Sequence, residues 1–343
     1  MARITALICV AASLGLTATA SSDAFATEDV ARAHALSFQW RGIEPEPLRH
    51  HGSVSFRFET SARSHSVDLS YVVSDSIGDV VAHASGISRS TGRDTINWDA
   101  RSDAGSPVVP GLYLVRITIV DRSGHSIRSA AKPFRVLTPG SSDVLQRVEH
   151  AGNDLALTFD DCYKQHAWAR LLRILSANHA EATFFCPGTQ VQRYPQLARR
   201  TIAQGNAVGS HGWDHRNPTR LSYRGIRSRL LKDESVWWRV ARSTPAPYYR
   251  PPYGVYDAKT LRAAGETGYV RTILWDVDPH DARRPGAAVI AHRVLSGVRE
   301  GSIVEMNVLG QTAAALPTIL KGLRRAGLRP VTLPALFNAS RAG

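Results

Sequence analysis

Two aspartates and two histidines are the residues of this chain with the most evident chemical potential. Asp160 and Asp161 follow the apolar run 155–159. Successive strand residues face opposite sides, so one carboxylate can bind a metal while the other remains a free base. His211 and His215 are spaced to lie one helical turn apart on the same side, where two imidazoles can share one ion. Together they predict a His₂Asp site that leaves positions open for water and substrate.

A third motif, residues 249–254, combines an arginine with two prolines. Pro251 and Pro252 fix the backbone, and Arg250 presents a fork suited to a carboxylate. Such a rigid loop can hold a donor for an oxyanion. Each motif taken alone also has an ordinary explanation. The aspartate pair can be a turn or helix cap, the histidines can lie on the surface, and the arginine can be solvated.

The elements that must position these motifs begin near residue 150, where helical and strand patterns alternate. Leucines at helical spacing in 171–175 and 316–323 are separated by short apolar runs that are typical of buried strands. This order predicts an α/β domain, a mainly parallel sheet or barrel wrapped by helices. Chemistry in such folds gathers at the carboxyl ends of the strands, so the polar residues after each run should meet there.

Residues 52–137 have a different pattern. Apolar and polar residues alternate at 67–73 and 113–119, and turn residues separate these runs. Period-two runs at this spacing predict a small all-β sandwich.

The first 26 residues predict a secretory signal peptide. Arg3 precedes an apolar stretch, and the small-residue sequences 18–20 and 24–26 are candidate cleavage sites, so the peptide ends at residue 20 or 26. The alternative is a buried first helix or a membrane anchor. No later stretch is apolar enough to span a bilayer, so we expect a secreted or cell-wall-associated mature chain with no integral membrane segment.

The chain is basic, with 42 Lys and Arg against 29 Asp and Glu and a net charge of +13, which is unchanged when residues 1–26 are removed. This charge favours polyanionic surroundings, such as wall polymers, anionic lipid or nucleic acid. Because the arginines are scattered and no nucleic-acid motif is present, we expect no nucleic-acid partner and favour an anionic cell wall.

Two cysteines remain after Cys9 leaves with the signal peptide. Cys162 and Cys186 each follow a predicted strand, so they can be neighbours on one rim. In an oxidising compartment we expect a disulfide, and the alternative is two separate core residues.

Taken in order, the motifs at 158–161, 210–215, 250–253 and 276–281 resemble the polysaccharide deacetylases of the NodB homology group, carbohydrate esterase family 4. The resemblance covers residues 150–335. It implies a distorted (β/α) barrel and a divalent ion, usually Zn²⁺, with Co²⁺ or a similar ion as the alternative. It also implies hydrolysis of N- or O-acetyl groups on an acetylated polysaccharide.

The sandwich segment carries a second resemblance. Residues 97–113 are similar to the FlgD-like immunoglobulin-type module, with Ala100 in place of a usual glycine. This resemblance implies that an immunoglobulin-like spacer domain precedes the barrel.

The first resemblance also implies roles for individual residues. Asp160 corresponds to the general base, Arg250 to the residue that orients it, and the backbone N–H of Tyr253 to an oxyanion donor. Asp281 corresponds to an acid that supports the arginine or a catalytic histidine, and Asp278 is a less secure partner. The matched metal ligands are Asp161, His211 and His215.

The chain departs from the family pattern at two places. Ala282 follows Asp281 where a tryptophan is usual, and residues 305–307 are Glu-Met-Asn where the family has L-x-H. Asn307 thus replaces the histidine that protonates the leaving amine, and Glu305 replaces a leucine of the acetyl pocket. No histidine follows His292, so a shifted alignment does not restore this acid.

Three hypotheses follow, in order of preference. The chain is an active deacetylase with another proton donor, which is metal-bound water, protonated Asp160 or His280. It acts on an O-acetyl ester, whose leaving group needs less help from an acid. It has lost catalysis and retains metal and sugar binding. We therefore predict a secreted, metal-dependent hydrolase of N- or O-acetyl groups on a cell-wall or extracellular polysaccharide. The alternative is a catalytically degenerate glycan-binding wall protein.

Overall fold

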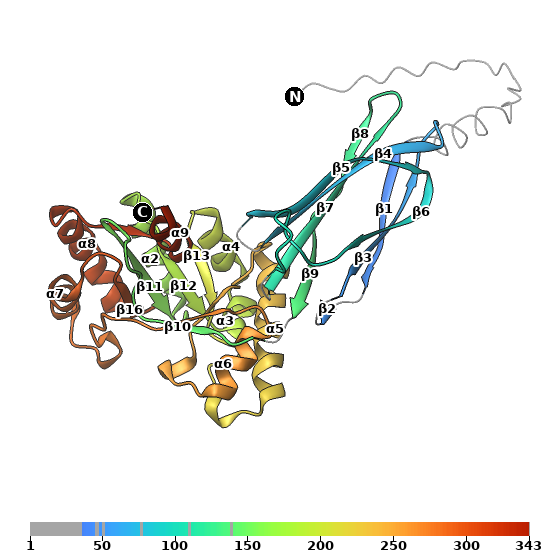
Figure 1. Ribbon diagram of the computed structural model, residues 1–343. Helices are drawn as coiled ribbons and strands as arrows, with labels where there is room; N and C mark the ends of the chain where they lie inside the picture. Colours follow the sequence, from blue (N-terminus) through green and yellow to red (C-terminus); the bar gives the residue numbers. More distant parts are fainter. Residues whose placement is uncertain are drawn as a thin grey trace, which may run out of the picture.

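The computed structural model describes residues 36–44, 48–49, 52–75, 78–108, 111–137 and 140–342. They form a sandwich of two β-sheets followed by a domain in which helices cover a parallel sheet (Figure 1). The predicted signal peptide, residues 1–26, lies outside the described residues. Within the described residues, no helix is long and apolar enough to cross a membrane.

The sandwich pairs a three-stranded sheet with a six-stranded one. The first has the order β1 (Ser37–Glu44), β3 (Val54–Ser61) and β6 (Gly92–Trp98). The second has the order β2 (Leu48–Arg49), β9 (Lys132–Leu137), β7 (Gly111–Asp121), β4 (Ser66–Asp75) and β5 (Val80–Ser90), and β8 (Ser126–Arg128) pairs with β7. The sandwich therefore includes β1, which begins before the predicted boundary at residue 52. On β1 exposed residues alternate with more buried ones, and only Ile43 is fully buried.

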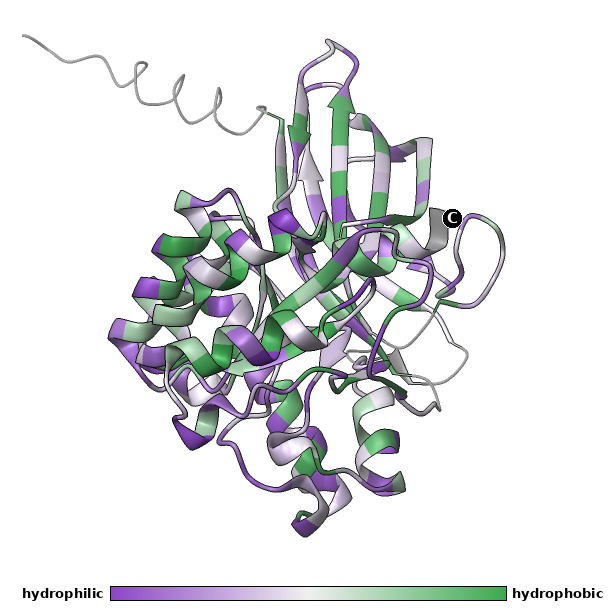
Figure 2. Ribbon diagram, turned by 90° about the vertical axis from the view of Figure 1, so that its left-hand side faces the viewer, coloured by the Kyte–Doolittle hydropathy of each residue, from purple (hydrophilic) through white to green (hydrophobic). Residues whose placement is uncertain are grey.

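The alternating pattern predicted for the sandwich is present in its longest strands. Inward residues of β4 and β7 are buried while their neighbours are more exposed, which gives the striped strands of Figure 2. The two sheets meet in an aromatic cluster. The Phe134 ring centroid lies 5.2 Å from that of Phe56 and 5.6 Å from that of Trp98. These rings join the two sheets into one apolar core.

The second domain contains an eight-stranded sheet in which every described pairing is parallel. Its order is β10 (Asp143–Leu145), β15 (Arg271–Ile273), β14 (Tyr248–Tyr249), β13 (Ala207–Ser210), β12 (Thr183–Cys186), β11 (Asp154–Asp160) and β16 (Ile303–Asn307), and β17 (Arg329–Val331) pairs with β11. All seven residues of β11 are buried, as expected for a parallel strand covered on both faces.

The two ends of this sheet approach each other. After β15 the chain continues to Asp276 and Val277, whose N–H groups donate to the carbonyl of Ile303 on β16 at 3.2 and 3.4 Å. In return, the N–H of Glu305 donates to the carbonyl of Val277 at 3.0 Å. The sheet is therefore strongly curved, which is consistent with the (β/α) fold expected from the sequence.

Helices cover the outer face of the curved sheet, except the last helix, which packs against the inner face through Leu333, Leu336 and Phe337. They are α2 (Gln165–Ala177), α3 (Gly188–Arg193), α4 (Pro195–Ala203), α5 (Tyr223–Ala241), α6 (Ala258–Gly265), α7 (Ala287–Gly297), α8 (Gly310–Arg325) and α9 (Leu333–Ala342). The stripe predicted at 171–175 is buried on α2, and the stripe predicted at 316–323 is buried on α8. Both stripes form one core with the strands, so they are structural, as predicted.

A buried ion pair joins the two domains. Arg135 of β9 lies 2.7 Å from Glu234 of α5, whose side chain is 1% exposed, and the Thr244 hydroxyl donates to the same carboxylate at 3.1 Å. Burial raises the pKa of Glu234, and Arg135 opposes that shift. Backbone packing is close at the same interface, because a side chain on Gly268 would collide with Gly111 of β7.

Candidate active site

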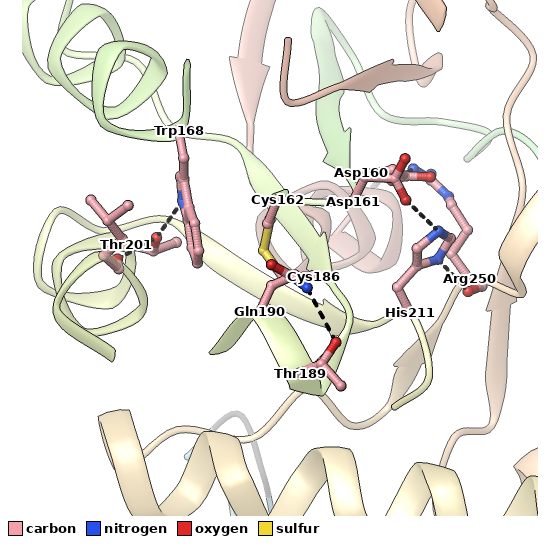
Figure 3. The surroundings of a disulfide bond; sticks show 11 residues. Asp160, Asp161, Cys162, Trp168, Cys186, Thr189, Gln190, Thr201, His211 and Arg250 are labelled. Atoms are coloured by element: carbon pink, nitrogen blue, oxygen red, sulfur yellow. Dashed lines mark hydrogen bonds and ion pairs between the residues drawn. A yellow bond between two sulfur atoms is a disulfide. The ribbon is translucent and has the colours of Figure 1, made fainter. Parts of the chain in front are cut away.

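The candidate site lies at the carboxyl end of the curved sheet, where strands β14, β13, β11 and β16 finish, with β12 between β13 and β11. Asp160 is the last residue of β11, and Asn307 is the last residue of β16. His211 follows β13 and Arg250 follows β14. The structure therefore brings together the motifs that the sequence places after separate strands, and Figure 3 shows Asp160, Asp161, His211 and Arg250 side by side.

The three predicted metal ligands face one another. Asp161 Oδ1 lies 3.1 Å from His215 Nε2 and 3.7 Å from His211 Nε2, and all three ligand atoms lie within 4.8 Å of one another. The histidines are not on a helix. Residues 211–215 form turns, and His215 adopts a φ of +56° that brings its ring back beside His211. The four-residue spacing therefore brings the two imidazoles together through a tight turn and not through a helix.

The protonation of these residues suits a divalent cation. His211 Nδ1 lies 2.8 Å from the carbonyl oxygen of Arg250, to which it donates, so Nε2 presents its lone pair to Asp161. Burial lowers the pKa of His211. Burial acts to raise the pKa of Asp161, but the His215 and His211 imidazoles hold it below its ordinary value. These shifts favour a neutral His211 and an ionised Asp161, the forms in which these two groups bind a metal.

The Asp161 carboxylate also has an unmatched oxygen. Asp161 Oδ1 is buried, and no donor in the described part of the chain meets it in hydrogen-bond geometry. A buried carboxylate oxygen without a donor is costly unless a cation or another donor compensates it. The residues present therefore fit a divalent ion.

Asp160 is held by a buried arginine. Arg250 is completely buried, and its Nη1 donates to Asp160 Oδ1 and to Thr158 Oγ1, both at 2.7 Å. Its Nε and Nη2 donate to the carbonyls of residues 273 and 274 at 3.1 and 3.2 Å. The guanidinium also stacks on Phe185, 4.3 Å from the ring centroid. A guanidinium fixed on every side holds the Asp160 carboxylate in one orientation.

Asp281 is fully buried, and the sequence predicted that it supports either Arg250 or a catalytic histidine. Its carboxylate accepts the backbone N–H and the side-chain Nδ2 of Asn307, each at 2.8 Å, and the Thr312 hydroxyl at 2.5 Å. Expected support of Arg250 is not observed, because the donors of Arg250 are directed to other acceptors. Asp281 instead holds the residue that stands where the family has a histidine.

Two further predicted residues pair with each other. Asp278 Oδ1 accepts the backbone N–H of His280 at 2.6 Å, and His280 Nδ1 lies 2.8 Å from Asp278 Oδ2. The His280 side chain is 47% exposed. Asp278 therefore stabilises its own loop, and the structure gives no contact between His280 and the metal triad among the described residues.

Glu305 is a buried carboxyl group whose chemical role the motif analysis missed. It pairs with Thr158 across β16 and β11, and Asn307 pairs with Asp160, so all four share one face of the sheet. Glu305 Oε1 accepts from Asn307 Nδ2 at 3.1 Å. Burial, reinforced by Asp160 and Asp281, raises the pKa of Glu305 well above its ordinary value. Its position two residues before Asn307 on a strand was the signal that could have placed it here.

Two tyrosines lie beside the metal triad. Tyr253, at a φ of +63°, is 66% exposed, and its ring centroid lies 4.6 Å from that of His215. Tyr163, which the sequence analysis did not single out, is 40% exposed with its ring 6.3 Å from His215. Exposed aromatic faces beside a polar site are suited to pack against sugar rings.

A groove continues from Tyr163 away from the triad. Its first part is a cavity of about 650 Å³ lined by Tyr163, Lys164, His166 and Arg284. A neighbouring cavity of about 490 Å³ adds Arg193 and Arg200. Among the described residues, no acidic side chain lines either part. The groove therefore offers a positive surface next to the site.

The loop that carries the aspartates is fastened by a disulfide. Cys162 and Cys186 are bonded, with their Cα atoms 5.2 Å apart, which confirms the predicted pair (Figure 3). The backbone N–H of Asp161 also donates to the carbonyl of Phe185 at 3.1 Å. The ends of β11 and β12 are thus joined directly beside the metal ligand.

A curved parallel α/β sheet that bears a His₂Asp triad beside an arginine-held carboxylate is the class of domain that the motifs predicted. The family model for polysaccharide deacetylase matches residues 147–272. The chain is 32% identical over 189 residues to a peptidoglycan-N-acetylglucosamine deacetylase of Bacillus cereus, and the match covers 53% of this chain and 87% of that protein. The chain therefore belongs to the polysaccharide deacetylase family.

Two other relatives show how far the likeness extends. Peptidoglycan-N-acetylglucosamine deacetylase PgdA of Listeria monocytogenes is 33% identical over 184 residues, which are 53% of this chain and only 38% of that protein. The crystal structure of a CE4 family pseudoenzyme from Bacillus anthracis matches with a TM-score of 0.55 and 25% identity. That match covers 60% of this chain and 75% of the other. The relatives thus include both deacetylases and a protein described as a pseudoenzyme.

Proposed function

We propose that this protein is a secreted, metal-dependent hydrolase that removes acetyl groups from amino sugars of a cell-wall polysaccharide. The observation that carries the proposal is the open Asp161–His211–His215 triad beside Asp160, with Arg250 fixing Asp160 at 2.7 Å. A protein that only binds glycans has no need of an oriented base next to a metal site.

Asp161, His211 and His215 would hold the ion, and two imidazoles with one carboxylate are a ligand set typical of catalytic zinc. When bound, the ion supplies Lewis acidity that polarises the acetyl carbonyl and eases the deprotonation of water. Asp160 accepts the proton of the attacking water, because Arg250 holds its carboxylate in one orientation beside the metal triad. The backbone N–H of Tyr253 donates to the oxygen on which negative charge develops.

Several features support a wall polysaccharide as the substrate. Tyr163 and Tyr253 present exposed rings beside His215 of the triad. The adjoining groove is lined by Lys164 and Arg284 and suits a polymer that bears carboxylates. The similar proteins of B. cereus and L. monocytogenes are peptidoglycan-N-acetylglucosamine deacetylases. We therefore propose peptidoglycan as the first substrate to test.

The proposed location rests on the sequence and on the disulfide. Residues 1–26 have the pattern of a signal peptide, and the Cys162–Cys186 bond is typical of an oxidising compartment. The FlgD-like sandwich is proposed to be a spacer that holds the catalytic domain within the wall.

A second candidate function is metal-dependent glycan binding without catalysis. Asn307 favours it, because an amide at the end of β16 cannot protonate a leaving amine. The similar B. anthracis structure is described as that of a pseudoenzyme. The two functions differ in one measurable property, the release of acetate.

The test is acetate release by the purified mature chain, loaded with zinc or stripped with EDTA. The substrates are N-acetylglucosamine oligomers, peptidoglycan and an O-acetylated xylan. The hydrolase predicts metal-dependent release from at least one of them, and the preferred polymer distinguishes N- from O-deacetylation. One equivalent of bound zinc without release from any of the three would replace the hydrolase by the glycan-binding protein.

A further inference from the structure

An N-acetyl substrate requires a proton for its leaving nitrogen. A positioned general acid accelerates such steps by about 10²–10⁴-fold. Asn307 cannot provide this proton, because its Nδ2 is an amide donor that is already bonded to Asp281 Oδ1 at 2.8 Å and Glu305 Oε1 at 3.1 Å. The proton must come from another group at this end of the sheet.

Three carboxyl groups lie there, and their hydrogen bonds differ. Asp160 Oδ1 accepts a hydrogen bond from the cationic Arg250 Nη1 at 2.7 Å. Asp281 accepts three donors, two from Asn307 and one from Thr312, so both of its oxygens already accept hydrogen bonds. Within the described residues, Glu305 accepts one hydrogen bond, at Oε1. Among the three carboxyl groups, Glu305 is therefore best able to carry a proton.

The surroundings of Glu305 favour its neutral form. It is 7% exposed, and the charged groups that face it are Asp160 of β11, Asp278 and Asp281 of the loop after β15, and Arg250 after β14. Burial is the largest cause that raises the pKa of Glu305, the three acids raise it further, and Arg250 opposes them. Because like charges close together disfavour further ionisation, these neighbours favour the protonated form of the buried Glu305.

We propose that Glu305 is the proton donor to the leaving group, an inference that rests on the proposed hydrolase function. The oxygen of water bonds to the acyl carbon while one water proton passes to Asp160. As the C–N bond breaks, the nitrogen keeps the electron pair and takes the proton of Glu305, which leaves a free amine and acetic acid. Asp160 then releases its proton to solvent and Glu305 takes one up, so both return to their initial states.

The test compares Glu305→Gln with wild type in the full, zinc-loaded mature chain. Glutamine keeps the shape and the oxygen that accepts from Asn307, but it has no acidic proton. The exposed Glu300→Gln is the matched control. Each protein is assayed on an N-acetylglucosamine oligomer and on 4-nitrophenyl acetate, whose phenolate leaves without an acid. Glu305→Gln is expected to lose about 10²-fold or more on the amide and to keep its rate on the ester.

The pH dependence gives a second signature. Because Glu305 acts in its protonated form, amide turnover by wild type should fall as pH rises through the raised pKa of Glu305. In Glu305→Gln that alkaline fall should disappear from the residual amide turnover.

Adding Asn307→His in the same background should restore amide hydrolysis, because an imidazolium then stands beside Asp281.

A third readout does not depend on turnover. The infrared C=O band of a protonated carboxyl group is recorded for wild type and Glu305→Gln, with and without zinc, as a function of pH. Their difference should contain one protonated carboxyl at neutral pH, while the buried Asp233 contributes equally to both spectra.

The outcomes distinguish the donor role of Glu305 from the hydrolase function on which it rests. Equal loss on amide and ester, or no loss on the amide, would overturn the donor role of Glu305 and leave the hydrolase intact. A difference spectrum without a protonated carboxyl would do the same. A wild-type chain that hydrolyses neither substrate would overturn the hydrolase and the donor role together.

Discussion

Asn307 and Asp281 form a pair in which an amide stands where the family pattern has an imidazole. Both hydrogen bonds from Asn307 to Asp281 are 2.8 Å long. Asn307→His should place a ring N–H against the same carboxylate and add a second acid to the site. We expect about a tenfold or larger gain in hydrolysis of N-acetyl oligomers, measured as kcat by acetate release, with little change on an activated ester. No gain would show that position 307 is too far from the leaving atom.

Asp233 on α5 is a second buried carboxyl, and it lies outside the proposed chemistry. It is completely buried, neither oxygen has a hydrogen-bond partner in the described structure, and burial raises its pKa well above the ordinary value. The folded protein therefore keeps a proton that the unfolded chain releases above about pH 4. Between that pH and the raised pKa, rising pH costs wild type about 1.4 kcal/mol of stability per unit.

Asp233→Asn removes this cost without changing the side-chain size. Its free energy of unfolding relative to wild type should therefore rise steadily from about pH 4 toward neutral pH. Urea unfolding at a series of pH values measures this difference. Parallel stability curves for the two proteins would show that Asp233 is ionised in the folded state.

At the scale of elements, the disulfide links the ends of β11 and β12 across a sequence separation of 24 residues. A loop of that size corresponds to about 3 kcal/mol of stabilisation in the chain-entropy model. Replacing both Cys162 and Cys186 by serine should therefore lower the free energy of unfolding by about that amount. Because Asp161 is next to Cys162, zinc affinity should weaken as well, which calorimetry would detect. Unchanged affinity would mean that the backbone hydrogen bond to Phe185 positions Asp161 alone.

The strand ends explain why much of the site could be predicted from the sequence. Asp160, His211 and Arg250 each follow a run whose apolar residues indicate a strand, and parallel strands bring their carboxyl ends together. The partner of Asp281 could not be predicted in the same way, because it depends on how the chain after β15 meets β16. Glu305 was visible as a departure from a motif, but its chemistry depends on burial and on the register with β11.

The fold was predictable to a similar extent. Alternating residues on β4 and β7 identify the sandwich, and the stripes on α2 and α8 identify the layered domain. The strand β1 lay outside the predicted boundary at residue 52, although its residues alternate in burial as a half-buried edge strand does.

In the whole molecule, the ion pair between the partly buried Arg135 and the buried Glu234 joins the two domains. Arg135→Met should leave Glu234 buried without its cation, and removing one partner of a buried pair costs about 3–5 kcal/mol. The double variant with Glu234→Met should recover most of that loss, because no uncompensated charge remains. Denaturant unfolding of the full chain tests both. A single variant as stable as wild type would mean that the interface does not depend on this pair.

The central claim, a metal held by three residues beside a separate base, is tested most directly by comparing His211→Ala with Asp160→Asn. Zinc stoichiometry and acetate release are measured on the same preparations. We expect His211→Ala to lose zinc and activity together, whereas Asp160→Asn should keep one equivalent of zinc and lose about 10²-fold or more in turnover. Full activity of Asp160→Asn, or zinc retained at full affinity by His211→Ala, would contradict this claim.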